Sequence, residues 1–215
     1  MRYGFTTGSC ATAGSKAATY MLLTGKLKQN ITIQTPKGIL FHAEILEITR
    51  SEKEVTCAVK KDGGDDPDIT SGALIFSTVS FADKEEKTLK QHNGQLSGIC
   101  VEAMQEKQAV IHIDGGKGVG RVTKPGLDQP VGNAAINHVP REMITKEVLE
   151  VCRLVDYKGG LAVEIFVPEG EQLAEQTFNP RLGIKGGISI LGSSGIVEPM
   201  SEKALTDSIG IEIRQ

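Results

Sequence analysis

Two periods of hydrophobic and polar positions run along this chain, and each predicts a different kind of element. Small apolar residues recur at helical spacing within residues 9–24, which predicts a helix there. Its apolar positions are Cys10, Ala13, Ala17 and Met21. Its candidate caps are Thr6, Thr7 and Ser9 at the start and Gly25 at the end. A face of such small side chains would allow the helix to pack closely against a sheet. A second helix is predicted over residues 140–155, with Pro140 at its start and a buried apolar stripe.

The remaining apolar positions mostly alternate with polar ones, as in half-buried strands. This period predicts strands around residues 31–33, 39–48, 55–59, 73–82, 108–114, 161–167 and 188–191. Turn-forming residues predict a turn at residues 36–38. We also predict a polar loop at residues 83–95, a long Gly-rich loop at residues 115–132 and a last helix from about Ser201. Several strands precede the second helix, so repeated βαβ units are not indicated. We predict an α+β fold in one domain (residues 1–215): a mixed β-sheet packed with a few helices, with Gly-rich loops between elements.

Composition narrows the functional classes. Of the 215 residues, 39% are hydrophobic and 24% charged, as in ordinary globular proteins. The formal net charge of −3 and the 4% aromatic content argue against a nucleic-acid partner. No stretch approaches the roughly 20 apolar residues of a membrane span, and the N-terminus lacks a signal-peptide pattern. We therefore expect a cytoplasmic protein with no membrane partner.

The four cysteines and four histidines do not form a metal-ligand spacing. We expect reduced thiols and no protein-bound metal, with Cys57 and Cys152 buried.

The first segment that could carry chemistry is the start of the first predicted helix, residues 6–10. Hydroxyls and free backbone N–H groups at a helix N-terminus favour a phosphate or carboxylate. The same position could lower the pKa of the Cys10 thiol and make it a nucleophile, as in a cysteine-dependent acyl transferase. Simple helix capping explains the residues equally well.

The second segment, residues 61–68, carries four carboxylates. Their spacing does not fit a calcium loop, because a glycine occupies a ligand position. A solvated acidic turn and a polar site, in which a carboxylate binds ribose hydroxyls or accepts a proton, both remain open.

Two Gly-rich segments, residues 115–127 and 178–195, follow strands or flank them. The segment 115–127 matches neither a dinucleotide-binding nor a Walker A motif. Their glycines with Lys117, Arg121, Lys124 and Arg181 permit close approach of an anionic ligand. The alternatives are a flexible loop for residues 115–127 and simple turns for residues 178–195. Arg141 is expected at the start of the second helix, where a cation opposes the helix dipole unless it serves a ligand.

Together these segments resemble the CbiD family of corrinoid C-methyltransferases. The matching strings are TTGSCATAGSKAA, KDGGDDPDIT, GGKGVGRVTKPGL, GNAAIN, VPREMI and NPRLGIKGGISILGSSGIVEPMS. His138 stands where the family usually has Pro, and Ser193 and Ser194 where paired Thr is common. Family members normally continue well beyond residue 215.

The resemblance implies methylation of carbon C-1 of a cobalt-containing tetrapyrrole, cobalt-precorrin-5B, by S-adenosyl-L-methionine on the route to cobalamin. Cobalt would belong to the substrate. Candidate ligands of the substrate are Thr6, Thr7, Ser9, Cys10, Lys117, Arg121, Lys124, Asn137, Arg141, Asn179 and Arg181. Candidate cofactor-binding residues are Gly116, Gly118, Gly192, Ser193 and Ser194. Asp65 and Asp66 are candidate bases. The alternative is a non-catalytic corrinoid-binding domain that needs the family's C-terminal region, with that region or a second copy as partner.

Overall fold

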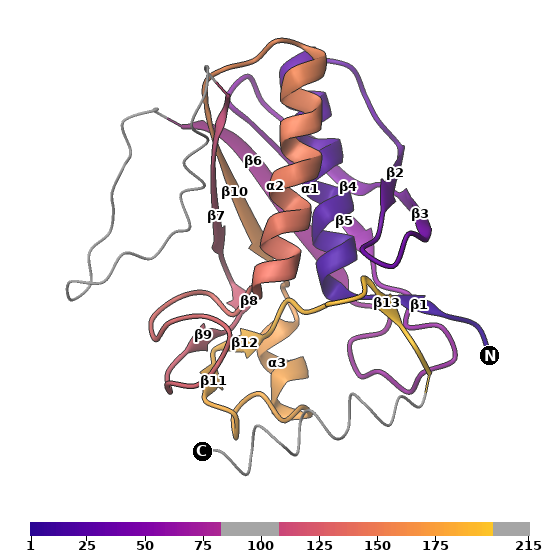
Figure 1. The fold of residues 1–215 in the computed structure, drawn as a ribbon, viewed down its shortest axis with the longest axis vertical. Helices are drawn as coiled ribbons and strands as arrows, with labels where there is room; N and C mark the ends of the chain where they lie inside the picture. Colours follow the sequence, from indigo (N-terminus) through magenta and orange to yellow (C-terminus); the bar gives the residue numbers. More distant parts are fainter. Residues whose placement is uncertain (83–107, 200–215) are drawn as a thin grey trace.

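The computed structural model describes residues 1–82 and 108–199. At its centre is a five-stranded sheet in the order β4–β5–β6–β10–β7 (Figure 1). These strands are Leu46–Arg50, Glu54–Lys60, Leu74–Ala82, Gly160–Phe166 and Val110–Gly115. β10 runs parallel to β7, whereas every other neighbouring pair is antiparallel. The predicted α+β fold with a mixed sheet is confirmed.

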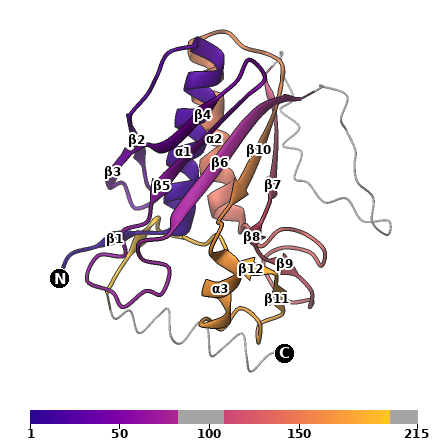
Figure 2. The same cartoon turned by 180° about the vertical axis from the view of Figure 1, so that it is seen from behind.

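Two long helices, α1 (Thr7–Thr24) and α2 (His138–Leu154), cover one face of the sheet (Figures 1 and 2). α1 contacts β5, β6 and α2. The close packing predicted from its small residues is confirmed: a Cβ added at Gly14 would lie 2.7 Å from the Ser77 Oγ. Both helix ends are confirmed as well, because Thr6 caps the start and Gly25, with φ 69°, ends the helix in the left-handed conformation.

The main core lies between the sheet and the helices. Alternate positions of β5, β6 and β10 point into it, including Val55, Ile75 and Leu161. Cys57 and Cys152 are buried in it, as predicted. Burial of this apolar surface is the main term that stabilises the domain.

The hairpin of β2 (Asn30–Gln34) and β3 (Leu40–Glu44) packs beside α1, and Gly38 takes φ 82° in its turn. The prediction of one strand over residues 39–48 was wrong. The chain leaves β3 after Glu44 and enters β4, where the register shifts between Leu46 and Thr49 and Glu47 takes φ 49°. An irregularity of this kind redirects a strand without interrupting the apolar pattern.

Below the sheet in Figure 1, two Gly-rich segments form paired short strands. β8 (Gly118–Val119) pairs with β12 (Gly187–Ile188), and β9 (Arg121–Val122) pairs with β11 (Ile184–Lys185). β1 (Gly4–Phe5) pairs with β13 (Ile196–Val197), and α3 (Gly170–Glu175) packs on β12.

The prediction of residues 115–132 as an unstructured loop was therefore wrong in part, since two-residue strands leave no period to detect. The loop and helix predicted for residues 83–95 and from Ser201 lie outside the described residues. No helix in residues 1–82 or 108–199 has the length and apolarity needed to cross a membrane.

Candidate functional site

The segments singled out in the sequence gather at one end of the molecule (Figure 1). α1 and α2 both begin at this end, and the parallel strands β7 and β10 both finish there. The fold thus brings together residues that are more than 180 positions apart in the chain, as the contact of Thr7 with Leu191 shows.

The start of α1 is bonded to residues 189–195. The Gly8 N–H donates to the Leu191 carbonyl at 2.8 Å, and the Ser9 hydroxyl donates to the Gly195 carbonyl at 2.6 Å. The Thr7 hydroxyl accepts from the Leu191 N–H at 2.9 Å, and the Thr6 hydroxyl accepts from the Ser9 N–H at 3.2 Å. Capping is confirmed for Thr6. Ligand binding by Thr6, Thr7 and Ser9 stays a prediction. A ligand would have to use hydrogen-bonding capacity of these hydroxyls that the contacts within the protein do not already occupy.

The reactive-thiol reading of Cys10 was wrong. The side chain is completely buried. Burial raises the pKa of its thiol to about 12, the opposite of the lowered pKa that a cysteine nucleophile needs. The helix N-terminus cannot compensate for this loss of solvation.

We expect Cys10 to resist iodoacetamide at pH 7.5 in the native protein and to react fully in denaturant, because both exposure and thiolate are lacking. Peptide mapping by mass spectrometry would measure the labelled fraction at this position. Rapid stoichiometric labelling of the folded chain would contradict the burial.

The acidic segment, residues 61–68, contacts the N-terminal residues of the chain. The Arg2 guanidinium pairs with Asp62, and the Arg2 N–H donates to the Asp65 Oδ2 at 2.6 Å. The hydrogen bond from Arg2 lowers the pKa of Asp62 to about 2. Asp68 accepts hydrogen bonds from Lys61 and Thr70. Asp62, Asp65 and Asp68 therefore have structural contacts. The described residues contain no His, Cys, Asp and Glu cluster suited to a metal ion.

The candidate cofactor glycines make close contacts within the protein. A Cβ added at Gly118 would lie 1.8 Å from the Val167 carbonyl oxygen, and one at Gly192 would lie 2.2 Å from the Thr6 hydroxyl. Gly116 faces the Glu164 carboxylate in the same way, at 2.7 Å. These glycines allow backbones to approach each other. Contact of Gly116, Gly118 or Gly192 with a cofactor stays a prediction.

Five cations from two distant segments form a feature that we call the basic lobe. Its members are Lys117, Arg121, Lys124, Arg181 and Lys185. The β9–β11 pair sets Arg121 opposite Lys185, and the Lys124 Nζ donates to the Arg181 carbonyl at 3.1 Å. All but the half-buried Arg121, which pairs with Asp114 at 2.7 Å, are exposed. Sequence reasoning missed Lys185, which only the strand register reveals.

Arg141 joins α2 to the end of β7. Its Nε donates to the Ile136 carbonyl and its Nη1 to the Ile113 carbonyl, both at 2.8 Å. Burial lowers the pKa of this guanidinium, although it remains charged at neutral pH. Arg141 therefore adds a fixed positive charge beside the basic lobe.

The start of α2 is capped by a residue that sequence reasoning missed. Asn137 is the N-cap but makes no side-chain cap bond. Asp128 takes that role: it accepts from the His138 N–H at 2.8 Å and also pairs with the imidazole. The hydrogen bond that the imidazole donates to Asp128 raises the pKa of His138. Asn179 is buried and accepts from the Ser189 hydroxyl at 3.3 Å.

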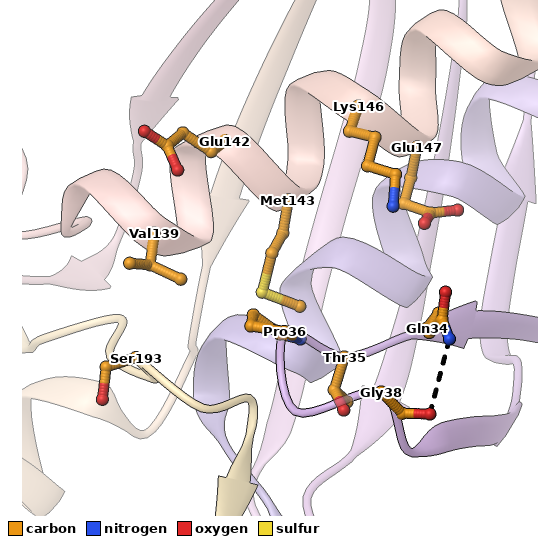
Figure 3. A pocket seen from close by; sticks show the side chains of 10 residues that line it. All are labelled: Gln34, Thr35, Pro36, Gly38, Val139, Glu142, Met143, Lys146, Glu147 and Ser193. Atoms are coloured by element: carbon orange, nitrogen blue, oxygen red, sulfur yellow. Dashed lines mark hydrogen bonds between the residues drawn. The ribbon is translucent and has the colours of Figure 1, made fainter.

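A cavity of about 480 Å³ lies beside α2, next to the residues described above (Figure 3). α2 lines it with Val139, Glu142, Met143, Lys146 and Glu147. The opposite wall is the β2–β3 turn, and Ser193 stands at one end. Glu147 is buried and pairs with Lys16 at 2.5 Å. Ser193, a candidate cofactor-binding residue, is thus on a cavity, while the Ser194 hydroxyl donates to the Ile196 carbonyl at 3.0 Å.

Residues 1–199 match the family model described as CbiD. The chain belongs to the CbiD family. Two CbiD relatives are named cobalt-precorrin-5B C(1)-methyltransferase. The one from Thermoanaerobacter sp. is 50% identical over 99% of this chain and 51% of its own length. The one from Ruminiclostridium cellulolyticum is 47% identical over 99% of this chain and 49% of its own.

A solved CbiD structure has the same fold. The cobalamin biosynthesis protein CbiD from Archaeoglobus fulgidus superposes with a TM-score of 0.63 at 27% sequence identity. The match covers 100% of this chain and 60% of that protein. The chain thus spans about half the length of the curated CbiD relatives that it matches.

Proposed function

We propose that this chain forms part of an S-adenosyl-L-methionine-dependent C-methyltransferase that methylates carbon C-1 of cobalt-precorrin-5B, giving cobalt-precorrin-6A in cobalamin biosynthesis. The names of relatives at 47–50% identity along nearly the whole chain support this assignment. The observation that carries it in the structure is the basic lobe, which places exposed cations together on a chain of net charge −3.

The proposed role of the basic lobe is to bind the acetate and propionate carboxylates of the tetrapyrrole. Arg181 can bind a carboxylate through two parallel hydrogen bonds, and lysine can neutralise it as a point charge. We propose further substrate contacts from residues at the same end of the molecule: Asn137, Arg141, Asn179 and the hydroxyls at the start of α1. The completely buried Cys10 would contribute only by filling space beneath them.

Methyl transfer from a sulfonium needs alignment more than activation. S-adenosyl-L-methionine supplies an electrophilic methyl group when it is bound. The protein's task would be to hold the acceptor ring in line with that group and to exclude water. Asp65 and Asp66 are proposed to accept any proton that the ring releases. Asp65 already accepts a hydrogen bond from the Arg2 N–H through its Oδ2, which fixes its position.

The proposed partners are the tetrapyrrole, the methyl donor and the half of the family sequence that this chain does not span. We place the reaction in the cytoplasm. The protein holds no metal in this proposal, because cobalt arrives within the substrate.

We expect charge removal in the basic lobe to weaken tetrapyrrole binding. Lys117→Gln and Arg181→Gln should each lower the affinity for cobyrinic acid about tenfold, since a hydrogen bond to a charged group contributes about 1.5–3 kcal/mol. Absorbance titration of the corrin bands would measure it. Lys53→Gln is the matched control, because Lys53 is also exposed but lies between β4 and β5, outside the lobe. Equal affinities for all three variants would contradict the role of the lobe.

Methyl transfer itself decides between the enzyme and a corrinoid-binding domain without catalysis. The chain would be incubated with cobalt-precorrin-5B and S-adenosyl-L-methionine, and the product followed by mass. A gain of one methyl group supports catalysis by this chain. Tight corrinoid binding without methylation would instead favour the binding domain, with the rest of the active site supplied elsewhere.

A further inference from the structure

The cavity beside α2 is large enough for a small molecule. Its volume of about 480 Å³ lies within the range of roughly 300–1,000 Å³ that ligand pockets occupy. It runs along α2, with the β2–β3 turn as its other wall (Figure 3). Helix α2 and the β2–β3 turn thus provide nine of its ten lining residues, and Ser193 provides the tenth.

The lining is divided into three parts along α2 (Figure 3). Glu142 lies at the end shared with Val139 and Ser193, and Lys146 lies at the end shared with Gln34. Met143 stands between them and points toward Thr35 and Pro36. Apolar side chains thus separate Glu142 at one end from the neighbouring Lys146 and Glu147 at the other.

The two charged residues are available to a ligand. Glu142 and Lys146 are four positions apart on a helix, the spacing at which such residues often pair. Both are exposed, and neither forms an ion pair with any residue that the structure describes. Glu147 differs, since it is buried and pairs with Lys16, which also pairs with Glu150. The cavity therefore presents the Glu142 carboxylate near one end and the Lys146 ammonium group, beside the Glu147 carboxylate, near the other.

We propose that this cavity binds the methyl donor, an adenosyl thioether or sulfonium that carries an amino-acid group. Lys146 would bind the α-carboxylate of the amino acid. Glu142 would accept hydrogen bonds from the ribose hydroxyls at the other end. Val139, Met143 and Pro36 would pack on the thioether and the adenine. Ser193 then borders the nucleoside, while Gly116 and Gly118 remain part of the packed backbone. This assignment rests on the proposed methyl transfer but concerns a separate surface from the basic lobe.

The test is calorimetric titration of the full chain with S-adenosylhomocysteine and, separately, with adenosine. We expect saturable binding of S-adenosylhomocysteine. Lys146→Met should weaken it about tenfold and leave the affinity for adenosine unchanged, because adenosine lacks the carboxylate. Glu142→Gln should weaken both ligands about tenfold. Ser193→Trp should abolish binding by filling the nucleoside end.

Matched controls are Arg153→Met and Glu175→Gln, which remove the same charges from exposed positions on α2 and α3 that do not line the cavity. Thermal melting of each variant would establish that it is folded. Unchanged affinity in the three cavity variants would overturn the site, as would a folded wild-type chain that does not bind S-adenosylhomocysteine. Cobyrinic acid titrated into the same samples separates the two proposals: its binding, lost only in basic-lobe variants, would uphold the substrate site even where the donor site fails.

Discussion

Gly118→Ala should destabilise the protein by about 4 kcal/mol, a large share of the roughly 5–15 kcal/mol that stabilises a domain. Gly118 has φ 73°, and its added Cβ would lie 1.8 Å from the Val167 carbonyl oxygen. Left-handed strain costs about 1–2 kcal/mol, and overpacking typically adds about 1–3 kcal/mol. The clash is with backbone, which cannot move aside as a flexible side chain does. Urea unfolding would measure the loss as a lower midpoint.

Substitutions at two further glycines would measure the backbone strain and the steric crowding separately. Gly126 has φ 93° but no atom within 4 Å of its added Cβ, so Gly126→Ala should cost only the strain, about 1–2 kcal/mol. Gly170 has no positive φ, but its Cβ would lie 2.1 Å from the Gly118 carbonyl oxygen, so Gly170→Ala should cost only the crowding. Equal losses at positions 118 and 126 would refute the close approach of β8 to the chain after β10.

Only the larger parts of the fold could be predicted from the sequence. The helix of small residues and the strands with strict alternation were found from the sequence, because their periods extend over many positions. β8, β9, β11 and β12 have two residues each and leave no such signal. The glycines there were interpreted as ligand-facing, since a ligand and a neighbouring backbone demand the same absence of a side chain.

The candidate site, too, could be predicted from the sequence only in part. The sequence singled out segments that prove to meet at one end, because each is polar or Gly-rich between regular elements; their contact with ligands stays a prediction. It could not show that Asp62 and Asp65 contact Arg2, since these contacts join residues about 60 positions apart. The partner of a polar residue depends on tertiary packing. The cavity residues Glu142 and Lys146 went unnoticed because charged residues on a helix are more often a solvated face.

Lys61→Met should cost about 3–5 kcal/mol, because it leaves the Asp68 carboxylate without its partner in a partly buried site. The Lys61 side chain is only 2% exposed, and its ammonium group pairs with Asp68. Lys60→Met is a matched control, since the preceding lysine is exposed at the end of β5 and its loss should change stability by less than about 0.5 kcal/mol. Urea unfolding of both variants would measure the difference. Similar midpoints would contradict the burial of the pair.

The pair also has a defined pH dependence. Burial of Asp68 opposes its ionisation, but hydrogen bonds from Lys61 and Thr70 outweigh that effect and lower its pKa in the folded protein. The contribution of Asp68 to stability is therefore complete above its unfolded value of about 3.9 and declines as the pH falls through the folded pKa. Lys61→Met should weaken this acid dependence, because the cation that favours the charged form is gone. Adding Asp68→Asn to Lys61→Met should restore part of the lost stability at pH 7, since the double variant leaves no unpaired carboxylate at this position. A double variant as unstable as the sum of both single changes would show that the two residues act independently.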